Sequence, residues 1–165
     1  MKILVLSDSH SSYSFMQDAV KAVKPDTIFH LGDYYDDGEM LHEQFPGIPF
    51  YQVPGNCDLF RCDSSIPQIM VPEIGGVRFY ITHGHRHFVK STLTELLKDA
   101  RAAGAQAALY GHTHIADCHR EADGLWVLNP GTCGYGGRTG GIVEVEDGNI
   151  ISCRILRQED LEGMK

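Results

Sequence analysis

Short apolar runs alternate with an amphipathic stretch in the first third of the chain. Residues 2–7, 27–31 and 48–53 have the length and the apolar content of buried strands. Between the first two runs, residues 13–23 place apolar side chains at helical spacing, and Pro25 marks the end of the predicted helix. This order of strand, helix and strand is typical of an α/β fold.

The rest of the chain is richer in predicted strands. Hairpins are expected where glycine-containing pairs separate apolar segments, at Gly75-Gly76 and, as a stronger signal, at Asp147-Gly148. Strands are expected over 68–73, 77–82, 107–110, 125–128, 139–146 and 149–156, and a helix over 91–103. The whole pattern predicts one domain over residues 1–165, a layered α/β sandwich with two sheets and helices outside.

Composition and charge narrow the class of protein. The 165 residues are 42% hydrophobic and 22% charged, which is typical of a globular domain. The net charge of −8 argues against a surface for the nucleic-acid backbone, which would need a basic stripe. The apolar run at residues 3–6 is too short for a signal sequence or a membrane span, and the five cysteines have no CxxC spacing. We therefore expect a soluble cytoplasmic protein with free thiols and no membrane contact.

Side chains that can bind metal ions follow five of the predicted strands. The segments are Asp8-Ser9-His10, Gly32-Asp33, Gly55-Asn56-Cys57-Asp58, His83-Gly84-His85 and Gly111-His112-Thr113-His114. In open α/β sheets, the carboxyl ends of the strands form the edge where ligands bind. Each segment alone could be an ordinary turn, but five of them at successive strand ends predict one metal site.

The candidate ligands are too many for one ion. They are Asp8, His10, Asp33, Asn56, His83, His112 and His114. A single ion takes about four to six ligands, whereas two ions that share Asp33 would use all of these side chains. Nitrogen and oxygen ligands suit first-row divalent ions such as Mn, Fe, Zn, Co or Ni. Two such ions about 3.5–4 Å apart are a known device for cleaving phosphate esters, and we expect a hydroxide that bridges them to attack phosphorus.

In this order, the five segments resemble the calcineurin-like metallophosphoesterases from residue 3 to about residue 132. The short chain, Gly55-Asn56-Cys57-Asp58 and the later Asn129-Pro130-Gly131-Thr132 resemble the small bacterial and archaeal phosphodiesterase branch. The resemblance implies a four-layer α/β sandwich with two central mixed β-sheets flanked by helices. It also implies one metal held by Asp8, His10, Asp33 and His114, and a second held by Asp33, Asn56, His83 and His112.

The resemblance further implies a metal-dependent hydrolase that acts on phosphodiester bonds of small substrates. Mn is the expected ion, with Ni, Zn, Fe and Co as alternatives. Many members place a histidine directly after the asparagine to protonate the leaving group, and Cys57 stands there instead, which leaves the general acid open. The candidate catalytic residues are Asn56, Cys57, Asp58 and His85, with Asp58 as a support for the ligands and His85 as a contact to substrate.

Three alternatives stay open for the function. The same site could prefer phosphomonoesters. A chain of this fold could be a non-catalytic scaffold, as in the retromer subunit that has lost ligands, although every ligand position is filled here. A nuclease of this family would carry further domains for duplex DNA, and this acidic chain has no room for one. We therefore expect a small phosphate ester as partner, no stable nucleic-acid binding and, from the resemblance alone, a homo-oligomer, either dimer or tetramer.

Several other polar residues have simpler interpretations. His30 lies inside an apolar run and is expected to be buried and hydrogen-bonded rather than a ligand. Surface positions are expected for His42, His87 and His119, and plain thiols for Cys62, Cys118 and Cys153.

Overall fold

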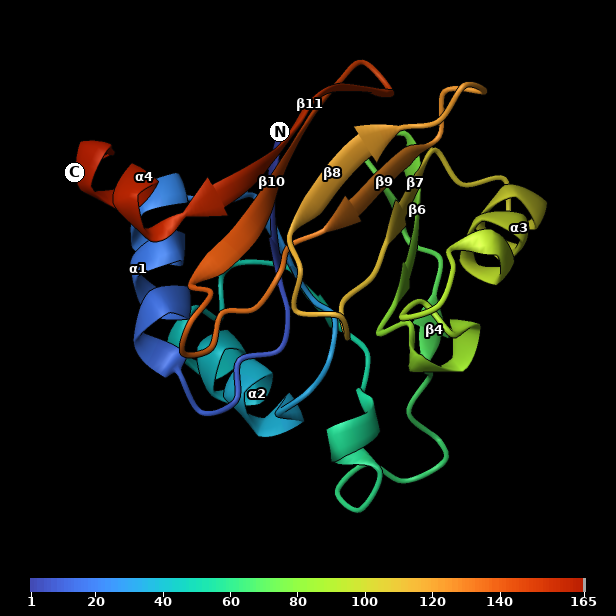
Figure 1. Cartoon of the computed structure of the whole chain (residues 1–165). Coiled ribbons are helices and arrows are strands. Elements are labelled where there is room, and N and C mark those ends of the chain that lie inside the picture. The colour runs from blue at the N-terminus through green and yellow to red at the C-terminus, as the bar shows by residue number, and fades with distance from the viewer. Residues whose placement is uncertain (165) are drawn as a thin grey trace.

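Two β-sheets face each other in the computed structural model, which describes residues 1–164, and helices lie on the outer sides (Figure 1). The strands are β1 (Lys2–Leu6), β2 (Thr27–His30), β3 (Phe50–Gln52), β4 (Ile69–Met70), β5 (Glu73–Ile74), β6 (Val77–Thr82), β7 (Ala107–Leu109), β8 (Asp117–Arg120), β9 (Trp126–Asn129), β10 (Thr139–Glu146) and β11 (Asn149–Arg157). The helices are α1 (Tyr13–Val23), α2 (Tyr35–Gln44), α3 (Thr94–Ala102) and α4 (Gln158–Gly163), and short 3-10 turns are η1 (Asn56–Asp58) and η2 (His85–His87).

Both sheets mix parallel and antiparallel neighbours. The five-stranded sheet A has the order β11-β10-β1-β2-β3, and the six-stranded sheet B has the order β4-β6-β7-β9-β8 with β5 paired to β6. Within sheet A, β1, β2 and β3 are parallel, and within sheet B, β6, β7 and β9 are parallel. The carboxyl ends of both parallel groups meet at one end of the sandwich, which is where the predicted metal-binding segments begin.

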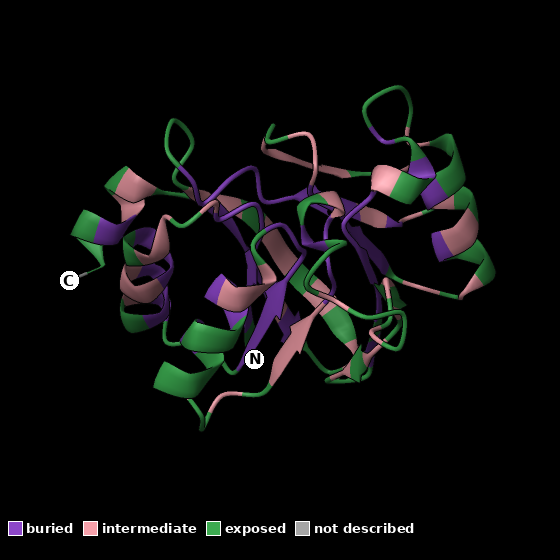
Figure 2. Cartoon of the chain, turned by 90° about the horizontal axis from the view of Figure 1, so that it is seen from below, coloured by how far each residue is buried: buried purple, intermediate pink, exposed green. Residues whose placement is uncertain are grey.

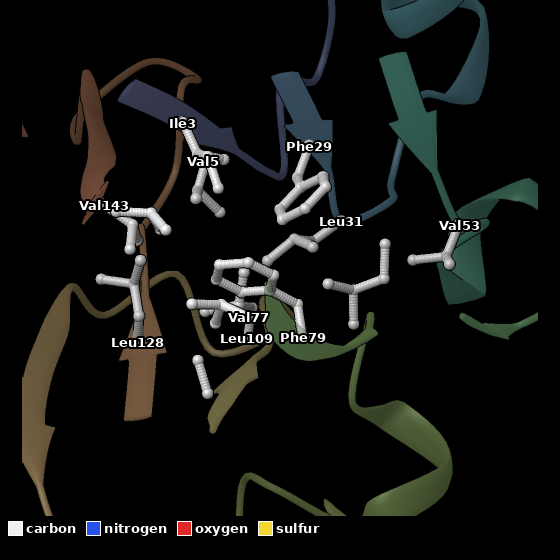
Figure 3. Packing of buried hydrophobic residues seen from close by; sticks show 13 residues of the cluster. Ile3, Val5, Phe29, Leu31, Val53, Val77, Phe79, Leu109, Leu128 and Val143 are labelled. Atoms are coloured by element: carbon white, nitrogen blue, oxygen red, sulfur yellow. The ribbon is translucent and has the colours of Figure 1, made fainter. Parts of the chain in front are cut away.

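The main core lies between the two sheets (Figure 3). Phe29 of β2 packs edge to face on Phe79 of β6, with ring centroids 5.4 Å apart. Burying one such large side chain stabilises the fold by about 1.5–3 kcal/mol. Further apolar clusters attach α1, α2 and α4 to the outer face of sheet A and α3 to sheet B. Figure 2 shows the buried residues gathered in the sheets, between helices whose outer faces are exposed. The layers are therefore helix, sheet, sheet and helix, as predicted.

The predicted helix over 13–23 is confirmed with the same bounds. Phe15, Met16, Ala19, Val20 and Val23 are buried, and the chain leaves the helix at Lys24, which adopts a left-handed conformation ahead of Pro25. Helix α3 begins at Thr94, three residues later than residue 91, because residues 88–92 form a turn held by Phe88. Among the helices of residues 1–164, none combines the length and the apolar content that crossing a membrane requires.

Some elements differ from the prediction. The expected strand over 68–73 is two short strands, β4 and β5, which pair with β6 on either side of Val71-Pro72, where proline offers no N–H to a ladder. Helix α2 was not predicted, because it contains Gly38 and buries few apolar side chains. The polar strand β8 and the short helix α4 were not predicted either, since neither carries a long apolar pattern.

Candidate metal centre

The loops that follow the strands bend the backbone sharply at the predicted ligands. Five of them have positive φ: Asp8 at 53°, His10 at 44°, Asp33 at 59°, His112 at 68° and His114 at 61°. Residues other than glycine seldom adopt this conformation, and such strain concentrates at functional sites. The tight turns aim side chains from several strands at one point.

One group of ligand atoms comes from Asp8, His10, Asp33 and His114, and these atoms all lie within 4.8 Å of one another. The Nε2 atom of His114 lies 3.0 Å from Asp8 Oδ1 and 3.3 Å from His10 Nε2. Asp8 Oδ1 is buried and accepts no hydrogen bond from the residues that the structure describes. Because two imidazole nitrogens and two carboxylates converge here, the group fits a divalent cation.

A second group surrounds His83. Its Nδ1 atom lies 2.7 Å from the carbonyl oxygen of Leu31, which can only accept, so Nδ1 carries the proton. The Nε2 atom therefore presents its lone pair to the site, 3.1 Å from Asn56 Oδ1 and 3.5 Å from Asp33 Oδ1. Burial lowers the pKa of His83 to about 4, so the ring is neutral and can bind a metal. The ring of His112 lies beside it, with centroids 5.1 Å apart.

Asp33 lies between the two groups. One carboxylate oxygen, Oδ1, is 3.5 Å from His83 Nε2, and the other, Oδ2, is 3.8 Å from His10 Nε2. Burial alone would raise the pKa of Asp33, but His83 and the backbone N–H of Cys57 outweigh burial and lower it. The carboxylate is thus ionised at neutral pH and faces both ligand groups.

The carboxyl group of Asp8 has a higher pKa than that of Asp33. Burial raises the pKa of Asp8 to about 6, and this effect exceeds the opposing hydrogen bond from the Ser7 hydroxyl. The N–H of His112 also donates to Asp8 Oδ2, at 3.1 Å. These donors leave Oδ1 as the oxygen that faces the histidines.

Asp58 is engaged by backbone rather than open to a ligand. Its oxygens accept hydrogen bonds from the N–H groups of Gly55 at 2.7 Å, Tyr35 at 2.9 Å and Asp33 at 3.0 Å. The side chain is buried. These contacts connect the loops after β2 and β3, so they fit the supporting role predicted for Asp58, while a direct catalytic role stays a prediction.

Cys57 and His85, the other candidate catalytic residues, lie beside the second group. The backbone N–H of Cys57 donates to Asp33 Oδ1 at 2.9 Å, and its exposed thiol lies 3.6 Å from Asn56 Nδ2. Partial burial and the charge of Asp33 raise the pKa of Cys57 to about 11, so the thiol is protonated at neutral pH. The half-buried ring of His85 is 5.5 Å from that of His83, between centroids, and burial lowers its pKa.

Several supporting contacts were not predicted from the sequence. The buried carboxylate of Asp37 accepts hydrogen bonds from Ser9 Oγ at 2.7 Å and from the N–H of Ser11 at 2.9 Å. The Thr132 hydroxyl donates to the carbonyl of Asp8 at 2.7 Å. Asn129 Nδ2 donates to the carbonyl of Gly111 at 3.1 Å. The sequence did point to the contacts of Thr132 and Asn129, because both residues belong to the segment Asn129-Pro130-Gly131-Thr132, which is part of the family resemblance.

Two histidines differ from their predicted environments. His30 is buried, as expected, but the expected hydrogen bonds are absent, since neither ring nitrogen has a partner within residues 1–164. His87 was expected at the surface and is 4% exposed. The η2 turn points its ring inward, where Nε2 lies 3.0 Å from the Tyr80 hydroxyl and 3.3 Å from Asp99 Oδ2.

A cavity of about 530 Å³ opens beside the first ligand group. His10 and Cys57 line the side next to the candidate metal centre, and Tyr34, Tyr35 and Met40 contribute apolar surface. The remaining lining is polar and comes from Ser11, Asp36, Asp37, Asp58 and Arg61. The ring of Tyr34 packs against that of His10, with centroids 4.9 Å apart. Arg61 also lines the cavity and pairs with Asp36. A substrate bound at the ligand groups therefore has room for an organic substituent.

Comparison with known proteins supports this fold and identifies the family. Residues 1–148 match the family model of the calcineurin-like phosphoesterase superfamily domain. The chain is 32% identical over 135 residues to the "Probable metallophosphoesterase YsnB" of Bacillus subtilis, covering 80% of this chain and 75% of that one. It is 29% identical over 163 residues to "Phosphodiesterase MJ0936" of Methanocaldococcus jannaschii, covering 88% and 94%.

A solved structure supports the same conclusion. A predicted phosphoesterase from Streptococcus pneumoniae has a TM-score of 0.76 and 26% identity, covering 96% of this chain and 90% of that one. The fold and the ligand groups define a metallophosphoesterase. The chain belongs to the calcineurin-like phosphoesterase superfamily, and the predicted family and fold class are confirmed.

Proposed function

We propose that the protein is a phosphodiesterase with two divalent metal ions, which hydrolyses small phosphate esters. The position of Asp33 is the main support for two ions, because its two carboxylate oxygens face separate groups of candidate ligand atoms. Asp8, His10 and His114 would hold one ion with Asp33. Asn56, His83 and His112 would hold the other. Bound divalent ions would supply a hydroxide nucleophile at neutral pH and would neutralise negative charge on the phosphate.

The chain's own groups orient the ligands and the substrate. Asp58 fixes the turns that carry Asp33 and Gly55, and the Leu31 carbonyl fixes the tautomer of His83. The neutral ring of His85 lies next to His83 and can donate a hydrogen bond to a phosphate oxygen. Cys57 is protonated but is a weak donor, so the site offers little assistance to a poor leaving group. This favours esters whose leaving group needs no strong acid.

The cavity beside His10 would hold the organic group of the ester. Its wall of Tyr34, Tyr35 and Met40 suits an aromatic or apolar substituent, and a diester has one such group left after its leaving group is placed. A monoester has none. The cavity is therefore our reason to favour diesters over the monoesterase alternative, together with the phosphodiesterase named among the relatives.

The protein's charge and its cysteines also bear on its partners and its location. The net charge of −8 disfavours long nucleic acid as a partner. The five cysteines, all within the described residues, are free thiols, which favours a cytoplasmic location. We also propose a homo-oligomer, on the family resemblance alone. Light scattering that gives the mass of one chain would contradict the oligomer, and a duplex shifted at low nanomolar protein and physiological salt would contradict the choice of partner.

Hydrolysis of bis(p-nitrophenyl) phosphate and of p-nitrophenyl phosphate, in parallel, tests the proposed reaction. We expect turnover of the diester with Mn²⁺, loss of turnover after chelation and recovery when Mn²⁺ is restored. We also expect kcat/KM to be at least about tenfold higher for the diester, since only the diester fills the cavity. Full activity of metal-stripped protein would contradict the metal mechanism, and a preference for the monoester would contradict the substrate class.

A further inference from the structure

Cys118 and Cys153 place their sulfur atoms 3.0 Å apart, although they belong to different sheets. Cys118 lies in β8 opposite Leu128 of β9, and Cys153 lies in β11 opposite Val143 of β10. Both thiols are free and half-buried against the core between the sheets. The contact therefore joins the terminal strands of the two sheets, and Cys118 lies four residues after His114, the last of the proposed metal ligands.

The geometry is close to that of a disulfide. A disulfide bond is about 2.05 Å long, so the sulfurs must approach by only about 1 Å. Strands β8 and β11 are the terminal strands of their sheets, so each is paired on one side and can move by this amount. No other sulfur–sulfur contact exists among the five cysteines, all of which lie in the described part of the chain.

We propose that Cys118 and Cys153 form a peroxide-sensitive modification site, at which hydrogen peroxide converts the two thiols into a disulfide that joins the sheets. The first sulfur, as thiolate, attacks one peroxide oxygen and the O–O bond breaks, which gives a sulfenic acid and hydroxide that is protonated to water. The second sulfur attacks the sulfenic sulfur, the S–O bond breaks and a second water leaves. In sum, two thiols and one peroxide give one disulfide and two waters.

The two thiols have different roles in this reaction. A hydrogen bond between the sulfurs lowers the pKa of Cys118 and raises that of Cys153. The thiolate is the reactive form, so Cys118 attacks peroxide and Cys153 resolves the sulfenic acid. The other thiols are poorer candidates, since burial raises the pKa of Cys133 to about 12 and that of Cys57 is about 11.

A disulfide at this position would stabilise the fold. It closes a loop that spans 35 residues, and closing a loop restricts the unfolded chain. We expect the melting temperature of the oxidised protein to rise by about 5–10 °C, an inference from typical disulfide energies in a domain of this size. The reduced and oxidised proteins should share the same metal centre, which the bond does not touch.

Peptide mapping of the metal-loaded full chain after hydrogen peroxide treatment tests the site. Trypsin should yield residues 102–120 joined to residues 139–154, which contain Cys118 and Cys153 respectively and no other cysteine. The intact mass should fall by about 2 Da, two hydrogen atoms, and two thiols should escape alkylation. Dithiothreitol should reverse both the link and the rise in melting temperature.

Single variants provide the controls. Cys118→Ser and Cys153→Ser should each abolish the linked peptide and the rise in melting temperature. Cys62→Ser removes another half-buried thiol and should leave both unchanged. The proposal is wrong if peroxide produces no 102–120 to 139–154 link in the wild-type chain, or if Cys62→Ser abolishes it, or if the link forms mainly between two chains.

Discussion

The carboxylate of Asp58 accepts a hydrogen bond of 3.0 Å from the backbone N–H of Asp33. Asp58 follows β3 and Asp33 follows β2, so this bond connects two of the loops that carry proposed ligands. The same carboxylate also accepts from Gly55 and Tyr35. Asp58 therefore holds Asp33 in place between His10 and His83. Both oxygens of Asp58 are engaged by backbone N–H groups.

We predict that Asp58→Asn weakens metal binding. The amide replaces one acceptor oxygen with an NH₂ group, which would face backbone N–H donors in a buried position. Loss of such a supporting partner typically costs about 10–100-fold in metal affinity or activity. Titration of Mn²⁺ into both proteins measures the change. Asp63→Asn, an exposed carboxylate of the following loop, is the matched control and should bind as wild type. Equal affinity of Asp58→Asn and wild type would contradict the supporting role.

Asp33→Ala should abolish diester hydrolysis and reduce bound metal more than any other single ligand change. The reason is that Asp33 is the one side chain proposed to contact both ions. Metal content and turnover should be measured on the same preparation, beside His30→Gln, whose ring lies outside both ligand groups and whose metal content should stay near normal. If His30→Gln loses its metal while His112→Ala keeps it, the ligand assignment is wrong.

Cys57→Ala should cost less than about tenfold in kcat on an activated aryl diester. General acid assistance is worth about 10²–10⁴-fold where a leaving group needs it, and an aryl oxide needs little. Asn56→Ala should cost far more, because it removes a proposed ligand. Cys57→His should raise turnover of esters with poor leaving groups more than that of aryl diesters.

The rival role for Cys57 is that of nucleophile or metal ligand. With the pKa near 11, about one thiol in 10⁴ is ionised at neutral pH, which disfavours a nucleophile. Were Cys57→Ala as inactive as Asn56→Ala on the same diester, with substrate protecting the wild-type thiol from alkylation, the rival role would hold.

His30 should make the protein less stable in acid. Burial lowers its pKa to about 4 in the folded chain, against about 6.5 unfolded, so the unfolded chain binds more protons between these values. The free energy of unfolding therefore falls as the pH drops from 6.5 toward 4. From pH 7 to pH 5 the free energy of unfolding falls by about 2 kcal/mol through the protonation of His30 in the unfolded chain.

Denaturant unfolding of metal-free wild type and His30→Gln at pH 7 and pH 5 isolates this effect. From pH 7 to pH 5, the free energy of unfolding of the wild type should fall by about 2 kcal/mol more than that of His30→Gln. This difference is the contribution of His30. His42 is an exposed residue of α2, so His42→Gln should show the same pH dependence of the free energy of unfolding as the wild type. An identical pH dependence for wild type and His30→Gln would show that His30 does not titrate in this range.

The sequence predicted which candidate ligands lie close together better than it predicted the contacts that hold their loops in place. Asp8, Asp33 and the histidines follow apolar strands, and the periodicity of those strands is a local property. Asp37 and Ser9 meet only after α2 folds against the loop that follows β1, and α2 itself has a weak apolar pattern. The environments of His30 and His87 depend likewise on neighbours from other elements. Long-range contacts between loops leave no periodic trace in the chain.

Manganese stoichiometry is the most direct test of the two-metal centre. Equilibrium dialysis followed by elemental analysis should find two ions per chain in the wild type and one in Asn56→Ala, which keeps Asp8, His10, Asp33 and His114 together. Diester turnover should depend on the second ion. A wild-type chain that is fully active with one bound ion, or an Asn56→Ala chain that still binds two with unchanged affinity, would contradict the account.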